Sequence, residues 1–308
     1  MKESSLLVVG SVAFDTVETR VGKRVEVLGG AASFVSAAAS FLAPRPRLVG
    51  IVGADFPDAY TKQLESHGVD LAGLERVTGR TFRWSGVYSP DFATRTTLDT
   101  QLNVFQEFRP KLPAGWADSD YVFLANIDPV LQLGVLEQAK KPKFVACDTM
   151  NLWIDIKKPE LLKLLERVDM LLLNDEEARQ LSGQANLPAA ARAIRAMGPG
   201  SVVIKRGDAG ALLFHEGGVF AAPAFPIEDV VDPTGAGDSF AGGFMGWLAR
   251  EGDTSPTTIR TSMIMGSVLA SFSVEDFSLD RFRRLDLGQI RERFAAFADL
   301  VHFEKIKL

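Results

Sequence analysis

Residues 231–244 read V-D-P-T-G-A-G-D-S-F-A-G-G-F, and three of them, Gly235, Ala236 and Gly237, carry little or no side chain. Their backbone N–H groups can therefore approach a ligand closely. The apolar pattern of a helix begins at Asp238, and a helix N-terminus offers unpaired N–H groups and about half a positive charge. This stretch predicts an anion-binding site at the start of a helix.

Asp238 lies at the rim of the predicted anion site, where its carboxylate would repel a phosphate. Asp is a favoured N-cap residue and glycines are common before helices, so the stretch also has a purely structural interpretation. A carboxylate is useful there if it takes a proton from a hydroxyl group that attacks a phosphoryl group. The stretch also contains Pro233, Gly242 and Gly243, which a simple helix cap does not require. We therefore interpret Asp238 as a helix cap that also serves as a general base.

The rest of the chain reads as an α/β protein. Short apolar runs alternate with helical patterns from residue 121 onward, which is typical of a mainly parallel sheet covered by helices on both faces. The expected strands are 6–10, 47–53, 121–125, 144–147, 170–173, 201–205 and 211–214. The expected helices are 31–42, 58–68, 130–140, 159–167, 175–182, 187–197, 238–251, 256–272 and 287–297. The length of 308 residues fits either two average domains or one large α/β domain.

Residues 16–27 and 79–108 have a different pattern, in which polar residues alternate with Val, Thr and aromatic residues. This alternation is typical of antiparallel strands with one face in water. We predict a small separate sheet that serves as a lid or as a contact between copies of the chain. Trp84, Tyr88 and Phe105 either stack on a ligand or form a seam against a partner sheet. The seam favours a homodimer through the lid.

The composition excludes several classes of protein. The net charge is −5 and no five like charges are consecutive, so we expect no nucleic-acid partner. A single cysteine excludes an intrachain disulfide, and three scattered histidines have no zinc-type spacing. The N-terminal strand pattern begins too early for a signal peptide, and the longest weakly polar run, 31–43, is shorter than the roughly 20 residues of a membrane crossing. We expect a cytoplasmic protein with no membrane partner.

Polar groups follow several of the predicted strands, where open α/β sheets contact their ligands. Asp15 follows the first strand and either binds substrate hydroxyls or caps a turn. Gly29 and Gly30 precede a helix of small residues and either permit close packing or form a simple tight turn. Asp148 and Asn151 are further candidates for the lining of a cleft.

Two later strand ends carry groups suited to a nucleotide. Asn174 and Glu177 are three residues apart, a spacing that suits magnesium with its waters and equally suits a capping box. Lys205 and Arg206 offer positive charge to a polyphosphate, and the glycines after them allow either a phosphate loop or a plain hairpin turn.

The two common nucleotide-binding motifs are absent from the 231–244 stretch. A dinucleotide fingerprint starting at Gly235 requires a third glycine at position 240, where this chain has Phe240. A phosphate-binding loop of the Walker type requires a Gly-Lys pair, and no lysine follows Gly237. Another class of nucleotide site is therefore needed to explain the stretch.

The stretch D-P-T-G-A-G-D-S-F-A-G-G-F closely resembles the C-terminal signature of the ribokinase-like (PfkB) carbohydrate kinase family. Other motifs of the chain agree with the family in type and order. They are the opening G-S-V-A-F-D, the pair Gly29–Gly30, G-A-D-F near residue 55, N-D-E-E at 174–177 and K-R-G-D-A-G at 205–210.

The resemblance implies a single kinase domain over 1–308, an α/β/α sandwich with a small β-sheet lid that transfers the γ-phosphate of ATP to an alcohol. Asp238 would be the general base, and the N–H groups of Gly235, Ala236 and Gly237 would form the anion hole. The other implied contacts are Asn174 and Glu177 for Mg²⁺ and phosphate, Lys205, Arg206, Gly207, Asp208 and Gly210 for the nucleotide, Asp15, Gly29 and Gly30 for the substrate hydroxyls, and Asp232 and Thr234 for a monovalent cation, usually K⁺.

Two positions depart from the family pattern and concern the acceptor. Phe34 stands where many sugar kinases of the family have Asn, and Asp148-Thr-Met-Asn151-Leu-Trp153 lacks the arginine that often ends this motif. We therefore expect ATP- and Mg²⁺-dependent phosphorylation of a hydroxymethyl group on a sugar or a nucleoside. The alternative is a non-catalytic nucleotide or metabolite sensor with the same fold.

Overall fold

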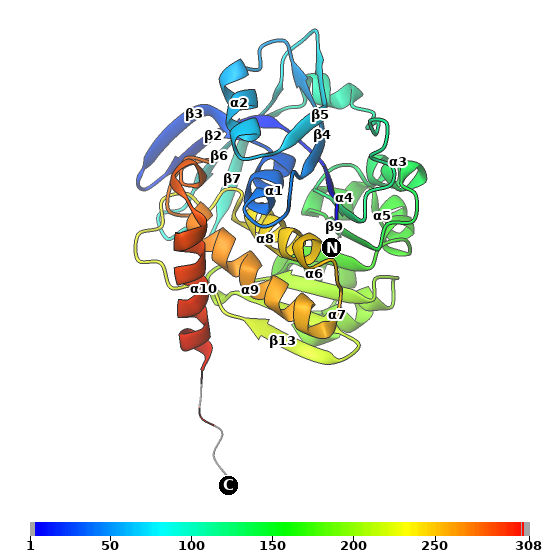
Figure 1. The fold of residues 1–308 in the computed structure, drawn as a ribbon, viewed down its shortest axis with the longest axis vertical. Coiled ribbons are helices and arrows are strands. Elements are labelled where there is room, and N and C mark those ends of the chain that lie inside the picture. The colour runs from blue at the N-terminus through cyan, green and yellow to red at the C-terminus, as the bar shows by residue number, and fades with distance from the viewer. Residues whose placement is uncertain (1–3, 303, 305–308) are drawn as a thin grey trace.

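The computed structural model describes residues 4–302 and 304, so the first residues used in the signal-peptide prediction lie outside the described part. Within that part the strands form a nine-stranded sheet in the order β13-β12-β11-β10-β9-β8-β1-β4-β5 and a four-stranded sheet in the order β3-β2-β6-β7 (Figure 1). The strands are β1 (Leu6–Val9), β2 (Ala13–Thr19), β3 (Gly22–Gly29), β4 (Arg47–Gly53), β5 (Asp70–Val77), β6 (Phe82–Tyr88), β7 (Arg95–Gln101), β8 (Tyr121–Leu124), β9 (Phe144–Asp148), β10 (Met170–Asn174), β11 (Ser201–Lys205), β12 (Ala211–His215) and β13 (Gly218–Ala222). The helices are α1 (Ala31–Ser40), α2 (Asp58–Ser66), α3 (Pro129–Gln138), α4 (Asn151–Ile156), α5 (Lys158–Leu165), α6 (Asp175–Ser182), α7 (Leu187–Arg195), α8 (Ala236–Glu251), α9 (Pro256–Ser273) and α10 (Leu287–Val301), with short 3₁₀ helices η1 (Asn103–Glu107), η2 (Gly207–Ala209) and η3 (Phe282–Arg284).

The strands of the large sheet from β11 to β5 are all parallel. Strands that are buried on both faces read as continuous apolar runs, and β1, which is wholly buried, has the sequence L-L-V-V. Strands β12 and β13 are antiparallel to their neighbours and complete one edge of the sheet. Because the parallel strands share one direction, their carboxyl ends lie along a single edge of the sheet.

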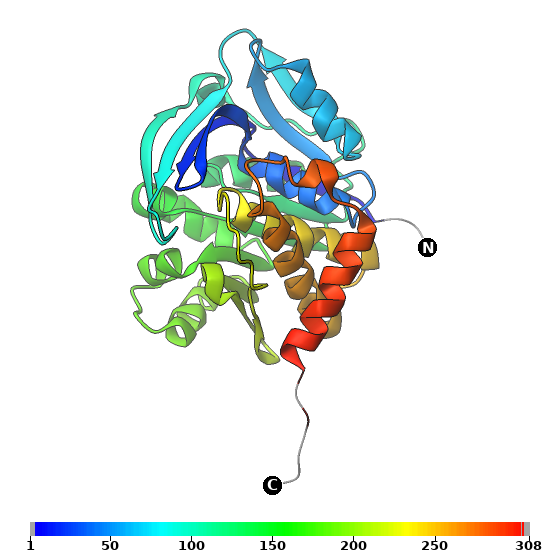
Figure 2. The ribbon, with the colours of Figure 1, turned by 90° about the vertical axis from the view of Figure 1, so that its left-hand side faces the viewer.

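Helices cover both faces of the large sheet. In β1, Leu6 and Val8 belong to one buried cluster, with side chains of α1, α8, α9 and α10, while Leu7 and Val9 belong to another, with side chains of α3, α5, α6 and α7. Figure 1 looks onto the first layer, with α9 and α10 in orange and red, and Figure 2 shows the molecule from the side. The result is the three-layer α/β/α sandwich that the sequence predicts.

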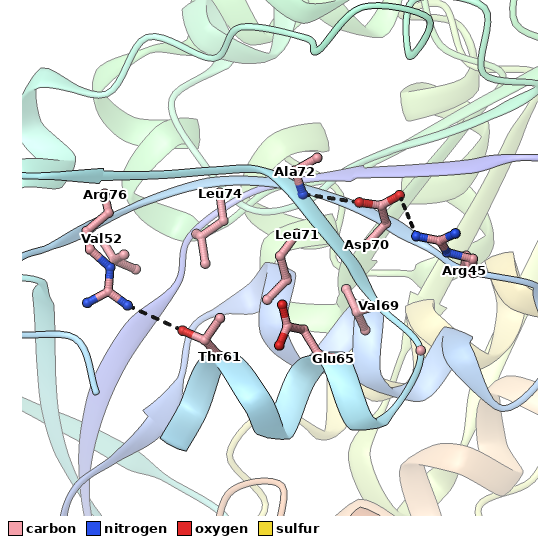
Figure 3. A pocket seen from close by; sticks show the side chains of 11 residues that line it. Arg45, Val52, Thr61, Glu65, Val69, Asp70, Leu71, Ala72, Leu74 and Arg76 are labelled. Atoms are coloured by element: carbon pink, nitrogen blue, oxygen red, sulfur yellow. Dashed lines mark hydrogen bonds and ion pairs between the residues drawn. The ribbon is translucent and has the colours of Figure 1, made fainter. Parts of the chain in front are cut away.

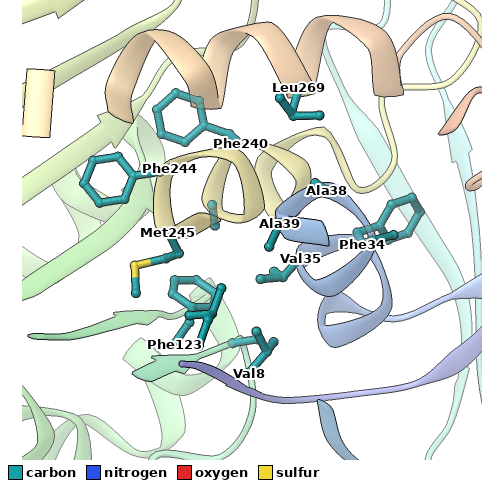
Figure 4. Close-up of a cluster of buried hydrophobic side chains, with 14 of the residues drawn as sticks. Val8, Phe34, Val35, Ala38, Ala39, Phe123, Phe240, Phe244, Met245 and Leu269 are labelled. Carbon is teal, nitrogen blue, oxygen red and sulfur yellow. The ribbon is translucent and has the colours of Figure 1, made fainter. Parts of the chain in front are cut away.

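Helices α1 and α8 pack closely because their facing residues are small. Figure 4 shows Val35, Ala38 and Ala39 of α1 next to α8. A Cβ atom on Gly242 would come within 2.7 Å of Ala38 Cβ and closer still to the Val35 carbonyl oxygen. Gly242 therefore allows the close distance between α1 and α8, while Gly243 faces Met265 and Gly266 of α9.

The four-stranded sheet contains most of the two segments predicted as a lid, but residues 103–107 of the second segment form the 3₁₀ helix η1 and not a strand. β2 pairs antiparallel with β3 and parallel with β6, and β6 pairs antiparallel with β7. Two contacts join this sheet to the loop before α8: Thr19 Oγ1 donates a hydrogen bond to the Val231 carbonyl at 2.9 Å, and Thr234 Oγ1 donates one to the Tyr88 hydroxyl at 3.2 Å. The small sheet thus lies against the loop that carries the predicted anion site.

The predicted cap of α8 is wrong. The helix begins at Ala236 and its N-cap is Gly235, which has a left-handed backbone conformation with φ of 75°. Glycine adopts this conformation without the steric cost that other residues incur. Asp238 therefore lies in the first turn of the helix, where its side chain is free for another role.

Three elements of the structure were not predicted from the sequence, namely β5, β13 and α4. Both strands lie at the edges of the large sheet and are partly exposed, so they lack the continuous apolar run of the central strands. Helix α4 has six residues, too few for a helical period to show. In addition, α10 continues to Val301, beyond the predicted end at residue 297.

Within the described residues, none of the helices combines the length and the apolar character needed to span a membrane.

Candidate active site

A cleft of about 2690 Å³ lies at the carboxyl edge of the large sheet and extends beneath the small sheet. It brings together most of the predicted site residues: Asp15, Gly30, Asn174, Glu177, Lys205, Arg206, Gly207, Asp208, Gly210, Thr234, Gly235, Ala236, Gly237 and Asp238, together with Phe34, Asp148 and Asn151. Gly29 and Asp232 do not line the cleft. Gly29 leaves the space that the Asp15 carboxylate occupies, and Asp232 accepts a hydrogen bond from the Thr234 N–H at 2.8 Å.

The loop before α8 forms a tight turn at the rim of the cleft. The Ala236 N–H donates to the Pro233 carbonyl at 3.2 Å, and the left-handed Gly235 redirects the chain into the helix. The ring of Phe34 lies directly against Gly235, since a Cβ atom there would come within 2.5 Å of the ring. Phe34 therefore packs against the turn that carries the predicted anion hole.

Asp238 lies beside a buried ion pair. Lys205 Nζ contacts Asp148 Oδ2 at 2.7 Å, and the same ammonium group would lie 3.2 Å from a Cβ atom on Gly237. Burial and the charge of Asp148 raise the pKa of Asp238 to about 7, although Lys205 acts in the opposite direction. Burial also acts to lower the pKa of Lys205, but Asp148 and Glu177 hold it above its ordinary value. A carboxyl group with a pKa near neutrality is suited to taking up a proton.

Asn174 and Glu177 form a capping box at the start of α6. The Glu177 N–H donates to Asn174 Oδ1 at 2.8 Å, and the Asn174 N–H donates to Glu177 Oε2 at 2.7 Å. Burial and the charge of Asp148 raise the pKa of Glu177 to about 7, so a cation nearby would relieve an unfavourable charge. In the described part of the chain, no three His, Cys, Asp or Glu side chains form a cluster for a metal. The Glu177 carboxyl group and the Asn174 amide therefore suit an ion such as Mg²⁺, which binds largely through water and phosphate.

Asp15 and Gly30 lie at the opposite side of the cleft from the capping box. Burial, with a smaller contribution from Asp232, raises the pKa of Asp15 to about 7. Gly30 has φ of 90°, and a Cβ atom there would come within 2.5 Å of the Ser11 carbonyl oxygen. The backbone at Gly30 therefore requires glycine, and it places the start of α1 next to the Asp15 carboxyl group.

Asp232 has one oxygen atom that the protein leaves unsatisfied. Oδ1 accepts from the Thr234 N–H, whereas the buried Oδ2 has no hydrogen-bond partner among residues 4–302 and 304. Burial raises the pKa of this carboxyl group above its ordinary value. An orphaned buried carboxylate oxygen is suited to a monovalent cation.

Residues 205–210 form a hairpin turn between β11 and β12, and they also form a wall of the cleft. The Arg206 N–H donates to the Gly210 carbonyl at 2.7 Å across the turn, and η2 lies between them. The K-R-G-D-A-G motif therefore forms the predicted hairpin turn, and its residues line the cleft where a nucleotide contact was predicted.

Comparison with known proteins identifies the family. Residues 3–281 match the family described as pfkB family carbohydrate kinase. The chain belongs to this family. Its similarity to a cytidine kinase of Thermococcus kodakarensis is 33% identity over 251 residues, 80% of this chain and 88% of the relative. A nucleoside kinase of Methanothermobacter thermautotrophicus is 29% identical over 316 residues, 96% of this chain and 97% of the relative.

Solved structures of kinases share the fold. The nucleoside kinase of Methanocaldococcus jannaschii, described as an archaeal member of the ribokinase family, has a TM-score of 0.76 at 20% identity and covers 96% of this chain and 99% of its own. The Burkholderia thailandensis nucleoside kinase in complex with inosine has a TM-score of 0.75 at 18% identity, over 95% of this chain and 97% of its own. The predicted family, kinase class and fold are thereby confirmed.

Some residues of this PfkB cleft were not predicted from the sequence. Arg95, at the start of β7, lines the cleft with its guanidinium carbon 5.3 Å from the centroid of Trp84, and its charge acts to lower the pKa of Asp238. Its position in an alternating strand pattern gives no sign of this role. Gln132 does not line the cleft but lies behind it: it is wholly buried in α3, and its Nε2 donates to the Asp148 carbonyl oxygen at 3.1 Å and to that of Ala125 at 3.0 Å. The sequence does hint at this residue, because an amide within the apolar run V-L-Q-L must find hydrogen-bond partners if it is buried.

A second cavity, of about 570 Å³, lies between α2 and β5, away from the polar strand ends (Figure 3). Three of its charged side chains already have partners: Arg45 pairs with Asp70 at 3.3 Å, and Arg76 contacts Asp58 at 3.2 Å. This cavity shares no residue with the 231–244 stretch, so we assign the active site to the larger cleft.

Proposed function

We propose that this PfkB kinase transfers the γ-phosphate of ATP to the hydroxymethyl group of a nucleoside, with Asp238 as the general base. The observation that supports this most directly is the position of Asp238. Its carboxyl group lies in the first turn of α8, beside the small residues Gly235 to Gly237 and the Lys205–Asp148 pair, with a pKa of about 7. A base of this pKa accepts a proton at neutral pH.

In the proposed reaction, Asp238 takes the proton of the acceptor hydroxyl as its oxygen attacks the γ-phosphorus. The new O–P bond forms while the bond from the γ-phosphorus to the bridging oxygen of ADP breaks, and ADP leaves with the electron pair. The N–H groups of Gly235 and Gly237, at the positive end of α8, stabilise the charge on the transferred group. The Ala236 N–H, the third member of the predicted anion hole, would have to exchange its hydrogen bond to the Pro233 carbonyl for one to this group. Lys205 adds a positive charge beside Gly237.

The nucleotide and its ions have candidate contacts on the same side of the cleft. Arg206, Gly207, Asp208 and Gly210 would border the nucleotide, as would Asn174. Mg²⁺, when bound near Glu177 and Asn174 through water, neutralises phosphate charge. A monovalent cation, for which K⁺ is the first candidate, would satisfy the orphaned Oδ2 of Asp232, with Thr234 nearby.

The acceptor is assigned to the other side of the cleft. Asp15 and Gly30 would hold its hydroxyl groups, while Gly29 leaves space for the Asp15 carboxylate. Relatives named cytidine kinase and nucleoside kinase support a nucleoside, and cytidine is the first compound to test. We also propose that the chain forms a homodimer through its small sheet, on which the side chains of Val21, Val25 and Leu98 are exposed.

The proposal is tested by measuring ADP release with cytidine, uridine, adenosine, inosine, ribose and fructose, each with ATP and Mg²⁺. Turnover is expected with at least one nucleoside. Turnover with a sugar alone would contradict the proposed acceptor. Bound ATP without turnover on any compound would favour the non-catalytic sensor.

Asp238→Asn tests the general base. Loss of a general base costs about 10²–10⁴-fold in turnover, so kcat should fall in this range while ATP still binds. Asp299→Asn is the matched control, because Asp299 is an exposed residue of α10 that does not line the cleft. An Asp238→Asn enzyme with near wild-type turnover would exclude the mechanism.

A further inference from the structure

Trp153 lies in a part of the cleft that the proposed chemistry does not use. It lies in α4 and lines the cleft, and its indole Nε1 donates a hydrogen bond to Asn126 Oδ1 at 2.9 Å. Asn126 follows β8 and α4 follows β9, so the ends of two paired strands hold the ring. Helix α4 is held in turn by α6, because Asn151 Nδ2 donates to Gln180 Oε1 at 2.8 Å.

The order of the strands places Trp153 next to the acceptor side of the cleft. The proposed nucleotide and Mg²⁺ contacts lie at the ends of β10 and β11, on one side of β8, whereas β1, which leads to Asp15, lies on the other side. After β8, Ala125 packs against Gly10, where an added Cβ atom would lie 2.7 Å from Ala125 Cβ. Asn126, the partner of Trp153, is the next residue. The strand ends that hold the indole ring, those of β8 and β9, therefore lie between the nucleotide contacts after β10 and the strand that leads to Asp15.

Part of the wall near Trp153 is apolar and exposed, beside the Lys157–Asp128 ion pair at 3.8 Å. Leu152, Ile156 and Val130 line the same cleft and have exposed fractions of 45%, 59% and 46%. Covering exposed apolar side chains with the apolar face of a ligand removes them from water, and this stabilises the complex. The flat face of a nucleobase is such a group, and it stacks on aromatic side chains with little dependence on sequence or substituent.

We propose that Trp153 is the platform on which the base of the acceptor nucleoside stacks, with Asn126 holding the indole in its orientation. This inference rests on the proposed function and names the residue that distinguishes a nucleoside from a sugar without a base. The stacking contact is present both before and during phosphoryl transfer. Its loss should therefore raise KM and leave kcat nearly unchanged.

Trp153→Leu and Trp153→Phe test the platform with cytidine, or with whichever nucleoside the wild-type enzyme prefers. The leucine variant should lower kcat/KM by about 5- to 100-fold, almost entirely through KM. The phenylalanine variant, which keeps an aromatic face, should recover most of this loss. For methyl riboside, which has no base, the three enzymes should have the same kcat/KM. An unchanged KM for the nucleoside in Trp153→Leu would overturn the proposal.

Fluorescence provides a readout that does not depend on turnover. Trp84 also lines the cleft, so the fluorescence variants are made in a Trp84→Phe background. In that background, nucleoside should quench the tryptophan emission of the parent protein and of Trp247→Leu, which alters a tryptophan of α8 outside the cleft. The quenching should disappear in Trp153→Leu, whereas ADP binding should remain. Quenching that persists in Trp153→Leu would contradict the platform. If the wild-type enzyme phosphorylates nucleosides and the variant behaves as wild type, the platform alone fails, and if no nucleoside is phosphorylated, the proposed function fails.

Discussion

The carboxyl group of Asp238 is held in surroundings that favour its neutral form. Burial and the charge of Asp148 raise its pKa from the ordinary 3.8 to about 7. A carboxyl group whose pKa is raised by folding stabilises the folded state while it is protonated, and this contribution disappears as the pH rises through the folded-state pKa. Above pH 7 the ionised carboxylate is therefore available as a base but makes the fold less stable.

Asp238→Asn should consequently raise the melting temperature at pH 8, even as it removes activity. Asparagine has a similar shape but no charge, so the variant avoids the cost of holding an ionised carboxylate in the folded protein. At pH 4 the wild-type carboxyl group is already largely neutral in the folded protein, and the difference in Tm should become small. Thermal unfolding at the two pH values measures this effect. A variant that is less stable than wild type at pH 8 would show that the Asp238 charge is well compensated.

The site residues close to one another in sequence were predictable, because their spacing reflects local geometry. The capping box at Asn174 and Glu177 and the small residues before Asp238 fall in this group. Arg95 and Trp153 were not assigned a role, since strands and loops far apart in the sequence bring them to the cleft. The position of Phe34 near the pocket was predicted, but its contact with Gly235 depends on the packing of α1 against the loop before α8.

At the scale of single elements, strand β7 brings the positive charge of Arg95 to the cleft. This charge acts to lower the pKa of Asp238, so its removal should raise that pKa above about 7. In Arg95→Met, the acidic limb of the kcat/KM profile should therefore move to higher pH, with lower activity at pH 7. The control is Arg24→Met, because Arg24 belongs to the same small sheet but lies over Phe277, 4.7 Å from the ring centroid. Superimposable pH profiles for wild type and Arg95→Met would contradict this role.

The contact between α1 and α8 depends on the absence of a side chain at Gly242. An added methyl group would meet Ala38 Cβ at 2.7 Å and overlap the Val35 carbonyl, so Gly242→Ala should lower the free energy of unfolding by about 1–3 kcal/mol. Gly134→Ala is the matched control in α3, where nothing lies within 4 Å of the new Cβ atom. That variant should gain about 0.5–1 kcal/mol from the better helix propensity of alanine. Chemical denaturation measures both, and equal effects in the two variants would refute the packing argument.

Elements that are buried on both sides were predictable from sequence, and those at the margins were not. The central strands are short apolar runs, and their number and order along the chain follow from the pattern. Strands β5 and β13 cover the edges of the sheet and are partly exposed, so they lack this pattern. The start of α8 was misplaced because aspartate is the commoner cap, whereas the turn here requires the left-handed Gly235.

At the scale of the whole molecule, the small sheet leaves apolar side chains uncovered. Val21, Val25 and Leu98 have exposed fractions of 54%, 65% and 59%. If a second copy covers this sheet, the mass in solution at micromolar concentration should be twice the 33.5 kDa of one chain, and Leu98→Asp should reduce it to that of the monomer. Sedimentation equilibrium measures the mass. A strictly monomeric wild-type protein would exclude the dimer.

The two hydrogen bonds between the small sheet and the loop before α8 have a consequence for the competition between water and the acceptor. Thr19 and Tyr88 contact Val231 and Thr234, so a small sheet that moves away from the cleft pulls on the loop that carries the proposed anion hole. The hole would then be complete only while the cleft is covered and water is excluded. Such a coupling would favour transfer to the acceptor over hydrolysis of ATP, because an open cleft that admits water would also have an incomplete anion hole.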